Sequence, residues 1–180
     1  MLRILAVLAI LLTLLSVREV RALEPGAETW DADVMRGITA FHLVVRPLSG
    51  DAGRAGLEAT DLKVQVEDRL RREGIALGRG REAVLRLTLD DIAQDPGPAS
   101  HHDYWLTLEL VQEAQLVDRP GTRSPVVTWS RIASGSHPAA DVPAQVHQSL
   151  RGALDDLVRD YRSVNSIAEL PAAAHLPEGD

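Results

Sequence analysis

The sequence contains no cysteine, which excludes several kinds of chemistry at once. A chain of 180 residues without cysteine forms no disulfide bond, has no thiolate nucleophile or ligand, and has no cysteine for the lipid attachment of a bacterial lipoprotein. Aromatic residues are scarce at 3%, and the single lysine is Lys63. We therefore expect one domain, stable without cross-links, whose core consists of Leu, Val, Ile and Ala.

Positive charge is the second shortage. The chain has 19 Lys and Arg residues against 26 Asp and Glu residues, a net charge of −7. Nucleic acids and anionic membrane surfaces attract proteins largely through basic side chains. The composition therefore predicts no nucleic-acid partner and no lasting attachment to an anionic membrane.

A hydrophobic run occupies the N-terminal residues. Arg3 precedes the 12 residues ILAVLAILLTLL, from Ile4 to Leu15. A membrane-spanning helix needs about 20 apolar residues, so the run favours a signal peptide at 1–22, cleaved after Ala22. Cleavage removes three arginines and one glutamate, which moves the net charge from −7 to −9. We expect a periplasmic or secreted protein, with an uncleaved anchor as the alternative.

Residues 38–165 read as one α/β domain, after a leader at 23–37 and before a flexible tail at 166–180. FHLVVRPL, residues 41–48, predicts a strand, and a four-residue spacing of apolar residues predicts a helix that Thr60 caps and Gly74 ends. Alternating apolar residues predict three further strands, and a last helix begins near Asp141 and ends at Asn165. The strands are expected at 84–93, from 104 towards 117, and at 126–134.

The order β-α-β-β-β-α predicts a two-layer α/β sandwich. Each strand has one apolar face and each helix has one apolar stripe, so a four-stranded mixed sheet should carry both helices on one face. A right-handed crossover through the first helix makes the first two strands parallel, and the last three strands form an antiparallel meander. The second face of the sheet is then left for water or for a partner.

That open face is the predicted working surface. If Leu43 and Val45 face the helices, Trp105 lies on the other side among polar groups, a composition typical of recognition surfaces. A contact between copies of the chain and a merely solvated face are the alternatives. The predicted partner-binding residues are Trp105, Arg46, Arg86, Glu109 and Thr107, with Trp129 as a further candidate whose strand phase is ambiguous.

The stretch SHHDYW, residues 100–105, raises the possibility of a metal site. His101, His102 or Asp103, together with His137 from a later loop, are residue types that bind zinc or copper. Their spacing matches no known metal-binding pattern, and the position after a proline-rich turn favours a polar hairpin tip. We therefore predict no metal and no cofactor, and keep a small metal-binding protein or hydrolase as an alternative.

Other short motifs fit ordinary structure better than chemistry. GRGREA, residues 78–83, follows a predicted helix and precedes a strand, the reverse of a dinucleotide-binding loop, so we interpret it as a turn. Ser136 and His137 are neighbours in a loop and are not expected to form a nucleophile–base pair. The paired carboxylates at 90–91 and 155–156 are interpreted as solvated charges.

Two segments also carry a family resemblance. With Thr128-Trp129, the stretches VEDRLRREGI (66–75) and VRDYRSVN (158–165) resemble a group of uncharacterised bacterial exported proteins with a V-E-x-x-L-R-x-x-G-I … D-Y-x-x-V-N pattern. By element order, the domain also looks like envelope domains such as the N-terminal domain of TolB or LptE-like proteins. These motifs look structural and imply no catalytic residues. Together with the predicted signal peptide and open sheet face, they favour an exported, non-enzymatic binding or accessory module of the bacterial cell envelope that binds an envelope protein, with a structural homo-oligomer as an alternative.

Overall fold

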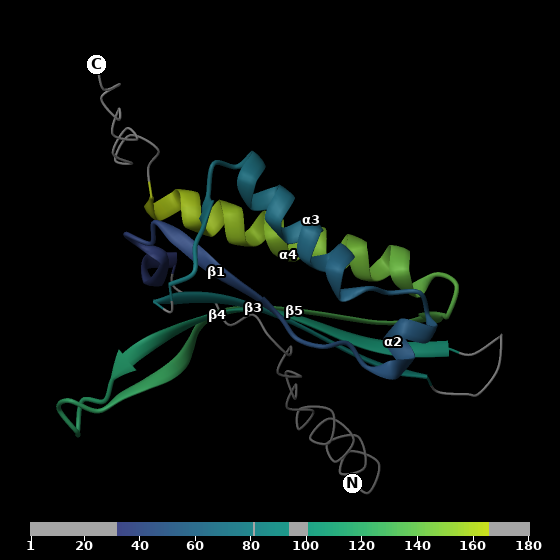
Figure 1. The fold of residues 1–180 in the computed structure, drawn as a ribbon, viewed down its shortest axis with the longest axis horizontal. Coiled ribbons are helices and arrows are strands. Elements are labelled where there is room, and N and C mark those ends of the chain that lie inside the picture. Colours follow the sequence, from purple (N-terminus) through teal and green to yellow (C-terminus); the bar gives the residue numbers. More distant parts are fainter. Residues whose placement is uncertain (1–31, 81, 94–100, 166–180) are drawn as a thin grey trace, which may run out of the picture.

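The computed structural model describes residues 32–80, 82–93 and 101–165, which form two layers (Figure 1). One sheet has the strand order β2-β1-β3-β4-β5. Its strands are β1 (Ala40–Val45), β2 (Ala76–Leu77), β3 (Ala83–Ala93), β4 (His101–Gln115) and β5 (Arg123–Pro138). Helices α3 (Ala59–Arg72) and α4 (Val142–Val164) lie next to each other on one face of the sheet, so the predicted α/β sandwich is confirmed. The predicted signal peptide at 1–22 and tail at 166–180 lie outside the described residues.

The strand directions agree with the predicted connections. β1 runs parallel to β3, with His42 opposite Val84 and Val45 opposite Leu87. β3, β4 and β5 pair in turn as an antiparallel meander. The chain between β1 and β3 passes through the helical layer, which is what a parallel pair requires because its strands cannot be joined by a tight turn.

The prediction of four strands and two helices was too low. β2 is a two-residue strand parallel to β1, with Ala40 opposite Ala76, and two residues are too few to show an alternating pattern. The short helix α2 (Gly50–Arg54) contains two glycines, a composition that reads as a loop. The 3-10 helix η1 (Ala32–Met35) places Met35, fully buried, in the core, so residues just before Ile38 also contribute to packing.

The C-terminus of α3 follows the predicted capping geometry, whereas its N-terminus does not. Gly74 has a φ of 72°, and the amide of Ile75 donates to the carbonyl of Leu70 at 2.9 Å, which is the Schellman arrangement. The helix begins at Ala59 after Glu58, so the expected N-cap at Thr60 was wrong by two residues. Glu58 makes no side-chain capping bond, which leaves the start of α3 set by packing rather than by a cap.

Helix α4 presents the predicted apolar stripe to the sheet. Asp141 precedes the helix and Pro143 lies in its first turn, although the Asp141 side chain makes no capping bond. At the other end, Asn165 accepts a hydrogen bond from the Gly37 amide at 2.8 Å and donates one to the Met35 carbonyl at 2.9 Å. The buried residues of α4 are Val142, Val146, Leu150, Ala153, Leu154, Leu157, Val158 and Tyr161.

A β-bulge divides β4 and β5 into two parts. Leu110 pairs with Trp129 but Val111 pairs with Val127, so Thr128 is an extra residue in β5. Between the start of β4 and the bulge, β4 and β5 pack against the helical layer. Val111 and Gln112 still pair with β3, and residues 113–125 extend beyond it as a hairpin arm (Figure 1). None of the helices in the described ranges combines the length and hydrophobicity needed to cross a membrane.

Candidate binding surface

The sheet face opposite the helices carries two exposed apolar side chains. Trp105 on β4 is 42% exposed and Ile132 on β5 is 70% exposed. Trp105 pairs with Ser134, and Thr107 pairs with Ile132, so Trp105 and Ile132 are diagonal neighbours on this face. No described helix covers them, because α3 and α4 both pack on the other side.

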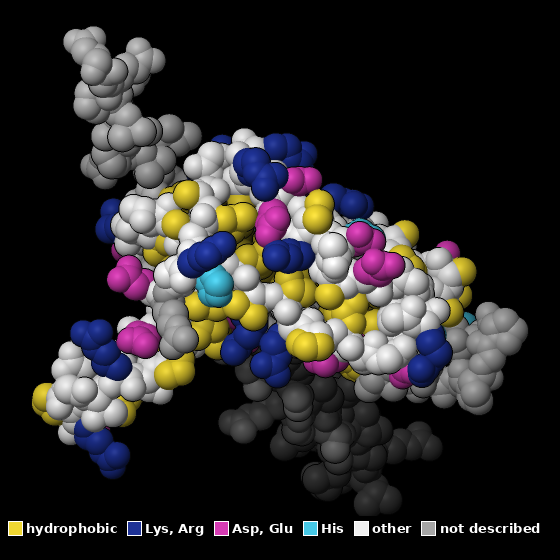
Figure 2. Space-filling model, in the orientation of Figure 1, with side chains coloured by type: hydrophobic (Ala, Val, Ile, Leu, Met, Phe, Trp, Pro, Cys, Tyr) yellow, Lys and Arg dark blue, Asp and Glu magenta, His cyan; other side chains and the backbone are white. Residues whose placement is uncertain are grey.

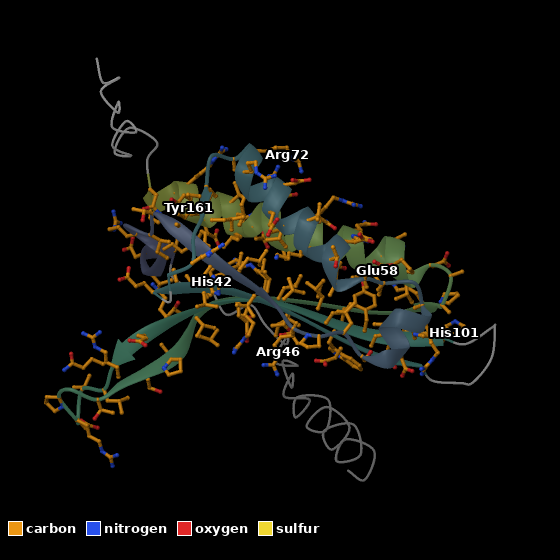
Figure 3. The ribbon with its side chains drawn as sticks, in the orientation of Figure 1. His42, Arg46, Glu58, Arg72, His101 and Tyr161 are labelled. Atoms are coloured by element: carbon orange, nitrogen blue, oxygen red, sulfur yellow. The ribbon has the colours of Figure 1, made fainter. Side chains whose placement is uncertain are left out.

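Alternation along β1 places the remaining predicted residues as expected. Leu43 and Val45 pack against the core, so His42 and Val44 face the open side. Arg46 follows β1 and is exposed, its amide donating to the Leu87 carbonyl at 2.9 Å, and Figure 3 shows it on the side of the sheet away from the helices. The open face is therefore continuous from β1 to β5.

Arg86 and Glu109 neutralise each other on this face. They are directly opposite in the β3–β4 register, with Arg86 Nε 2.8 Å and Nη2 2.7 Å from Glu109 Oε2. Such a cross-strand pair stabilises the sheet modestly and presents no net charge. Thr107 thus lies beside a neutral pair, whereas Trp105 lies directly opposite Asp90, an exposed carboxylate on β3.

A shallow groove continues the open face towards the hairpin arm. Its volume is about 250 Å³, and most of its lining is apolar. His42 Nδ1 lies 3.2 Å from the Gly78 carbonyl, which fixes the ring at one end of the groove. The lining residues are His42, Val44, Val84, Val111, Gln112, Glu113 and Pro125. The sequence pattern did not single out this groove, since its lining comes from four different strands.

Trp129 does not belong to the open face. Its side chain is fully buried on the helix side, and its Nε1 donates to Asp160 Oδ2 at 3.0 Å. The Arg131 guanidinium lies 4.9 Å from the indole centre and also contacts Asp156 and Asp160. The suggestion that Trp129 joins Trp105 was wrong. Trp129 pairs with Leu110, which alternation along β4 places on the face opposite Trp105.

The polar hairpin tip predicted for the His-His-Asp stretch was also wrong. His101 and His102 are the first residues of β4, and their side chains lie on opposite faces: His101 is exposed and His102 is 4% exposed. His102 Nδ1 lies 2.9 Å from Asp91 Oδ2, and Asp91 is 2% exposed. Asp91 is therefore a buried, paired carboxylate rather than the solvated charge expected for residues 90–91.

The metal-site residues are only partly brought together. His102 pairs with His137 across β4 and β5 and shares its face, whereas Asp103 pairs with Ser136 on the opposite face. The His137 ring stacks on Tyr104, with 6.1 Å between centres, so it is held by an aromatic contact. Within the described ranges, no three His, Asp or Glu side chains are grouped as a metal ion requires.

Gly135 explains how His137 comes to lie against Tyr104. A Cβ at Gly135 would stand 2.8 Å from His137 Nε2 and 2.9 Å from Tyr104 Cε1, closer than side chains tolerate. Ser136, next in β5, points to the opposite face, so it forms no nucleophile–base pair with His137. The arrangement is a packed aromatic contact.

Comparison with known proteins gives structural likeness only. No family model and no curated protein sequence matches the chain. A PelC variant dodecamer from Paraburkholderia phytofirmans is 19% identical with a TM-score of 0.42, over 66% of this chain and 87% of that chain. The rare lipoprotein B from Shewanella oneidensis is 15% identical with a TM-score of 0.36, over 69% and 94%. A minor lipoprotein from Acinetobacter baumannii is 18% identical with a TM-score of 0.31, over 70% and 90%.

These TM-scores are low, so no property of the three proteins is assigned to this chain. Two of them are named as lipoproteins, whereas this sequence has no cysteine to carry a lipid. The resemblance of residues 66–75 and 158–165 to a group of bacterial exported proteins stays a prediction.

Proposed function

We propose that the chain is an exported, non-enzymatic accessory module of the bacterial cell envelope that binds another envelope protein through the open face of its sheet. The observation that carries the proposal is the adjacent pair Trp105 and Ile132, exposed by 42% and 70% on a face that no described helix covers. Tryptophan is enriched among residues that dominate binding energy, because it buries a large area with few rotatable bonds. The hydrophobic run at residues 4–15 supports export.

The binding role can be separated from stability by comparing two tryptophans. Trp105→Ala should change the free energy of unfolding by less than about 1 kcal/mol, because the side chain is already half in water. Trp129→Ala, the matched control, should cost about 3–5 kcal/mol, because it empties a fully buried site. Urea denaturation measures both, and a collapse of the Trp105→Ala variant would place Trp105 in the core and contradict the proposal.

Site-specific photocrosslinking in the native envelope tests the partner itself. A photoreactive residue at position 105 should give a discrete crosslinked product, because it stands at the centre of the proposed interface. The same residue at Val64, which is 47% exposed on α3, is the control on the opposite layer. Equal crosslinking at the two positions would exclude a specific interface on the open face.

A second copy of the chain is the alternative partner. It is favoured by β5, a 16-residue edge strand whose outer side pairs with no other strand among the described residues. In that case the crosslinked product at position 105 would have twice the mass of the chain, and light scattering would report an oligomer that Ile132→Ser weakens.

A further inference from the structure

The outer surface of the helical layer contains a groove with arginine on both sides. Gln65, Arg69 and Arg72 are spaced along one face of α3, and Arg151, Leu154 and Asp155 along one face of α4. Together they line a groove of about 230 Å³ whose buried residue is Leu154, at 1% exposed. Figure 2 shows basic side chains gathered over this layer, and Figure 3 places Arg72 there.

The carboxylates around the groove are already engaged by Arg69. Its Nη1 lies 2.8 Å from Glu73 Oε1, and its Nη2 lies 2.9 Å from Asp155 Oδ1. Glu73 also pairs with Arg162, so each of its two carboxylate oxygens already contacts an arginine. Among the lining residues, Asp155 is the single acidic side chain against three arginines, which leaves a net charge of about +2 in a protein whose overall charge is −7.

Arg72 and Arg151 supply that excess charge. Within the described residues neither forms an ion pair, and Arg72 is bonded through Nε to the Asp68 backbone carbonyl at 3.2 Å, which leaves its terminal nitrogens for another acceptor. Arg69 adds a further unused donor: its buried Nε has no hydrogen-bond acceptor among the described residues. A buried N–H without an acceptor is costly, so this side of the groove contains a polar group that the described residues leave unsatisfied.

We propose that the groove between α3 and α4 binds a phosphate monoester group, with Arg72 and Arg151 as its principal contacts. Guanidinium forks match phosphate oxygens in pairs, and a phosphate monoester carries about −1.5 to −2 charges near neutral pH, close to the excess charge of the lining. The groove is smaller than the 300–1,000 Å³ or so of typical small-molecule pockets, so it fits the phosphate group and leaves the rest of its carrier outside.

Calorimetric titration of inorganic phosphate into the purified full chain tests the site. We expect saturable binding with one phosphate per chain. Arg72→Gln or Arg151→Gln should weaken it about tenfold or more, because each removes charge-assisted hydrogen bonds. Asp155→Asn should strengthen it about two- to fivefold, because it removes the one acidic side chain that competes for the arginines.

Arg71→Gln is the matched control. Arg71 is exposed on the same helix and paired with Asp68 at 2.6 Å, it lies outside the groove, and its loss changes the net charge as much as the loss of Arg72. It should leave phosphate affinity within about twofold of the parent. Equal weakening by Arg71→Gln and Arg72→Gln, or no saturable binding at all, would overturn the proposal.

Vesicles identify the source of the phosphate group. Binding to phosphatidylcholine vesicles that contain phosphatidic acid, lost in the Arg72→Gln variant, would assign a lipid head group. Binding of inorganic phosphate with no response to these vesicles would assign a soluble phosphate ester. Both results support the site, and both are independent of Trp105, so failure here leaves the proposed role of the open face to its own test.

Discussion

Asp91 and His102 form a buried polar pair on the helix side of β3 and β4. The two residues are 2% and 4% exposed, and His102 Nδ1 lies within 3.2 Å of both carboxylate oxygens. The backbone carbonyl of Asp91 also accepts a hydrogen bond from Ser49 Oγ at 3.0 Å, and Ser49 caps α2 through the Ala52 amide. The pair therefore holds a helix and two strands together, and each partner satisfies a group that burial would otherwise penalise.

Removal of either Asp91 or His102 alone should strongly reduce the stability of the fold. His102→Ala leaves the Asp91 carboxylate buried without this partner, and we expect the free energy of unfolding to fall by roughly 3 kcal/mol or more. Urea denaturation followed by circular dichroism measures the loss. His101→Ala, at the exposed neighbour on the other face, is the control and should cost less than about 0.5 kcal/mol.

A double variant distinguishes pairing from packing. Asp91→Val combined with His102→Leu replaces the pair with apolar side chains and should be more stable than His102→Ala alone, because no buried polar group is stranded. A His102→Ala variant as stable as the parent would contradict the structural role of the pair.

At the scale of elements, the end of α3 depends on one backbone conformation. Gly74 has a φ of 72°, which places Ile75, 4% exposed, against the core and turns the chain towards β2. A Cβ at Gly74 would meet no atom within 4 Å, so backbone strain alone determines the effect of a substitution. The turn is thus a clean position at which to measure that strain.

Two glycine substitutions should change stability in opposite directions. Gly74→Ala should destabilise by about 1 kcal/mol, because alanine disfavours a positive φ. Gly152→Ala lies in the middle of α4, also without an atom within 4 Å of the new Cβ, and should stabilise by about 0.5–1 kcal/mol. Thermal unfolding midpoints compare them, and a midpoint of Gly74→Ala at or above that of the parent would refute the assigned turn geometry.

At the scale of the whole molecule, Tyr161 joins the last helix to the first described segment. Its hydroxyl donates to the Ile38 carbonyl at 2.8 Å, and its ring packs edge-on against Phe41 with 5.7 Å between centres. Burial raises the pKa of Tyr161 above its ordinary value of 10.0, because the phenolate would be poorly solvated there. The contact between α4 and the segment around β1 therefore depends on Tyr161 being protonated.

Alkaline pH should weaken the fold through this tyrosine. Because the folded pKa is the higher one, the stabilising contribution is complete below about pH 10 and is lost as the pH rises through the folded pKa. The Tyr161→Phe variant cannot ionise at this position, so its free energy of unfolding should fall less than that of the parent between about pH 9 and pH 11. At neutral pH the variant should be about 1 kcal/mol less stable than the parent, because it lacks the hydrogen bond. Parallel urea titrations across this range check the difference, and identical slopes would contradict it.

Much of the architecture could be predicted from local patterns. Leu85, Leu87 and Leu89 alternate with polar residues and are buried, and the α4 stripe from Val146 to Tyr161 packs as its spacing predicts. The short elements β2 and α2 were not predicted. The two residues of β2 and the glycine-containing sequence of α2 are too short to show a period of hydrophobic residues. The open face was predicted as a surface, but Ile132 and the arginine groove were not.

The sequence by itself determined the two-layer sandwich, the face that each regular strand buries, and the turn that ends α3, since these follow from the period of hydrophobic residues and from the freedom of glycine. Tertiary structure alone decided the rest. The β4–β5 register pairs Trp129 with Leu110 on the buried face while Trp105 stays outside, and the β3–β4 pairing brings Asp91 to His102. Strand register, bulges and side-chain partners depend on which strands pair with each other. Pairing between distant segments leaves no local pattern in the sequence of either segment.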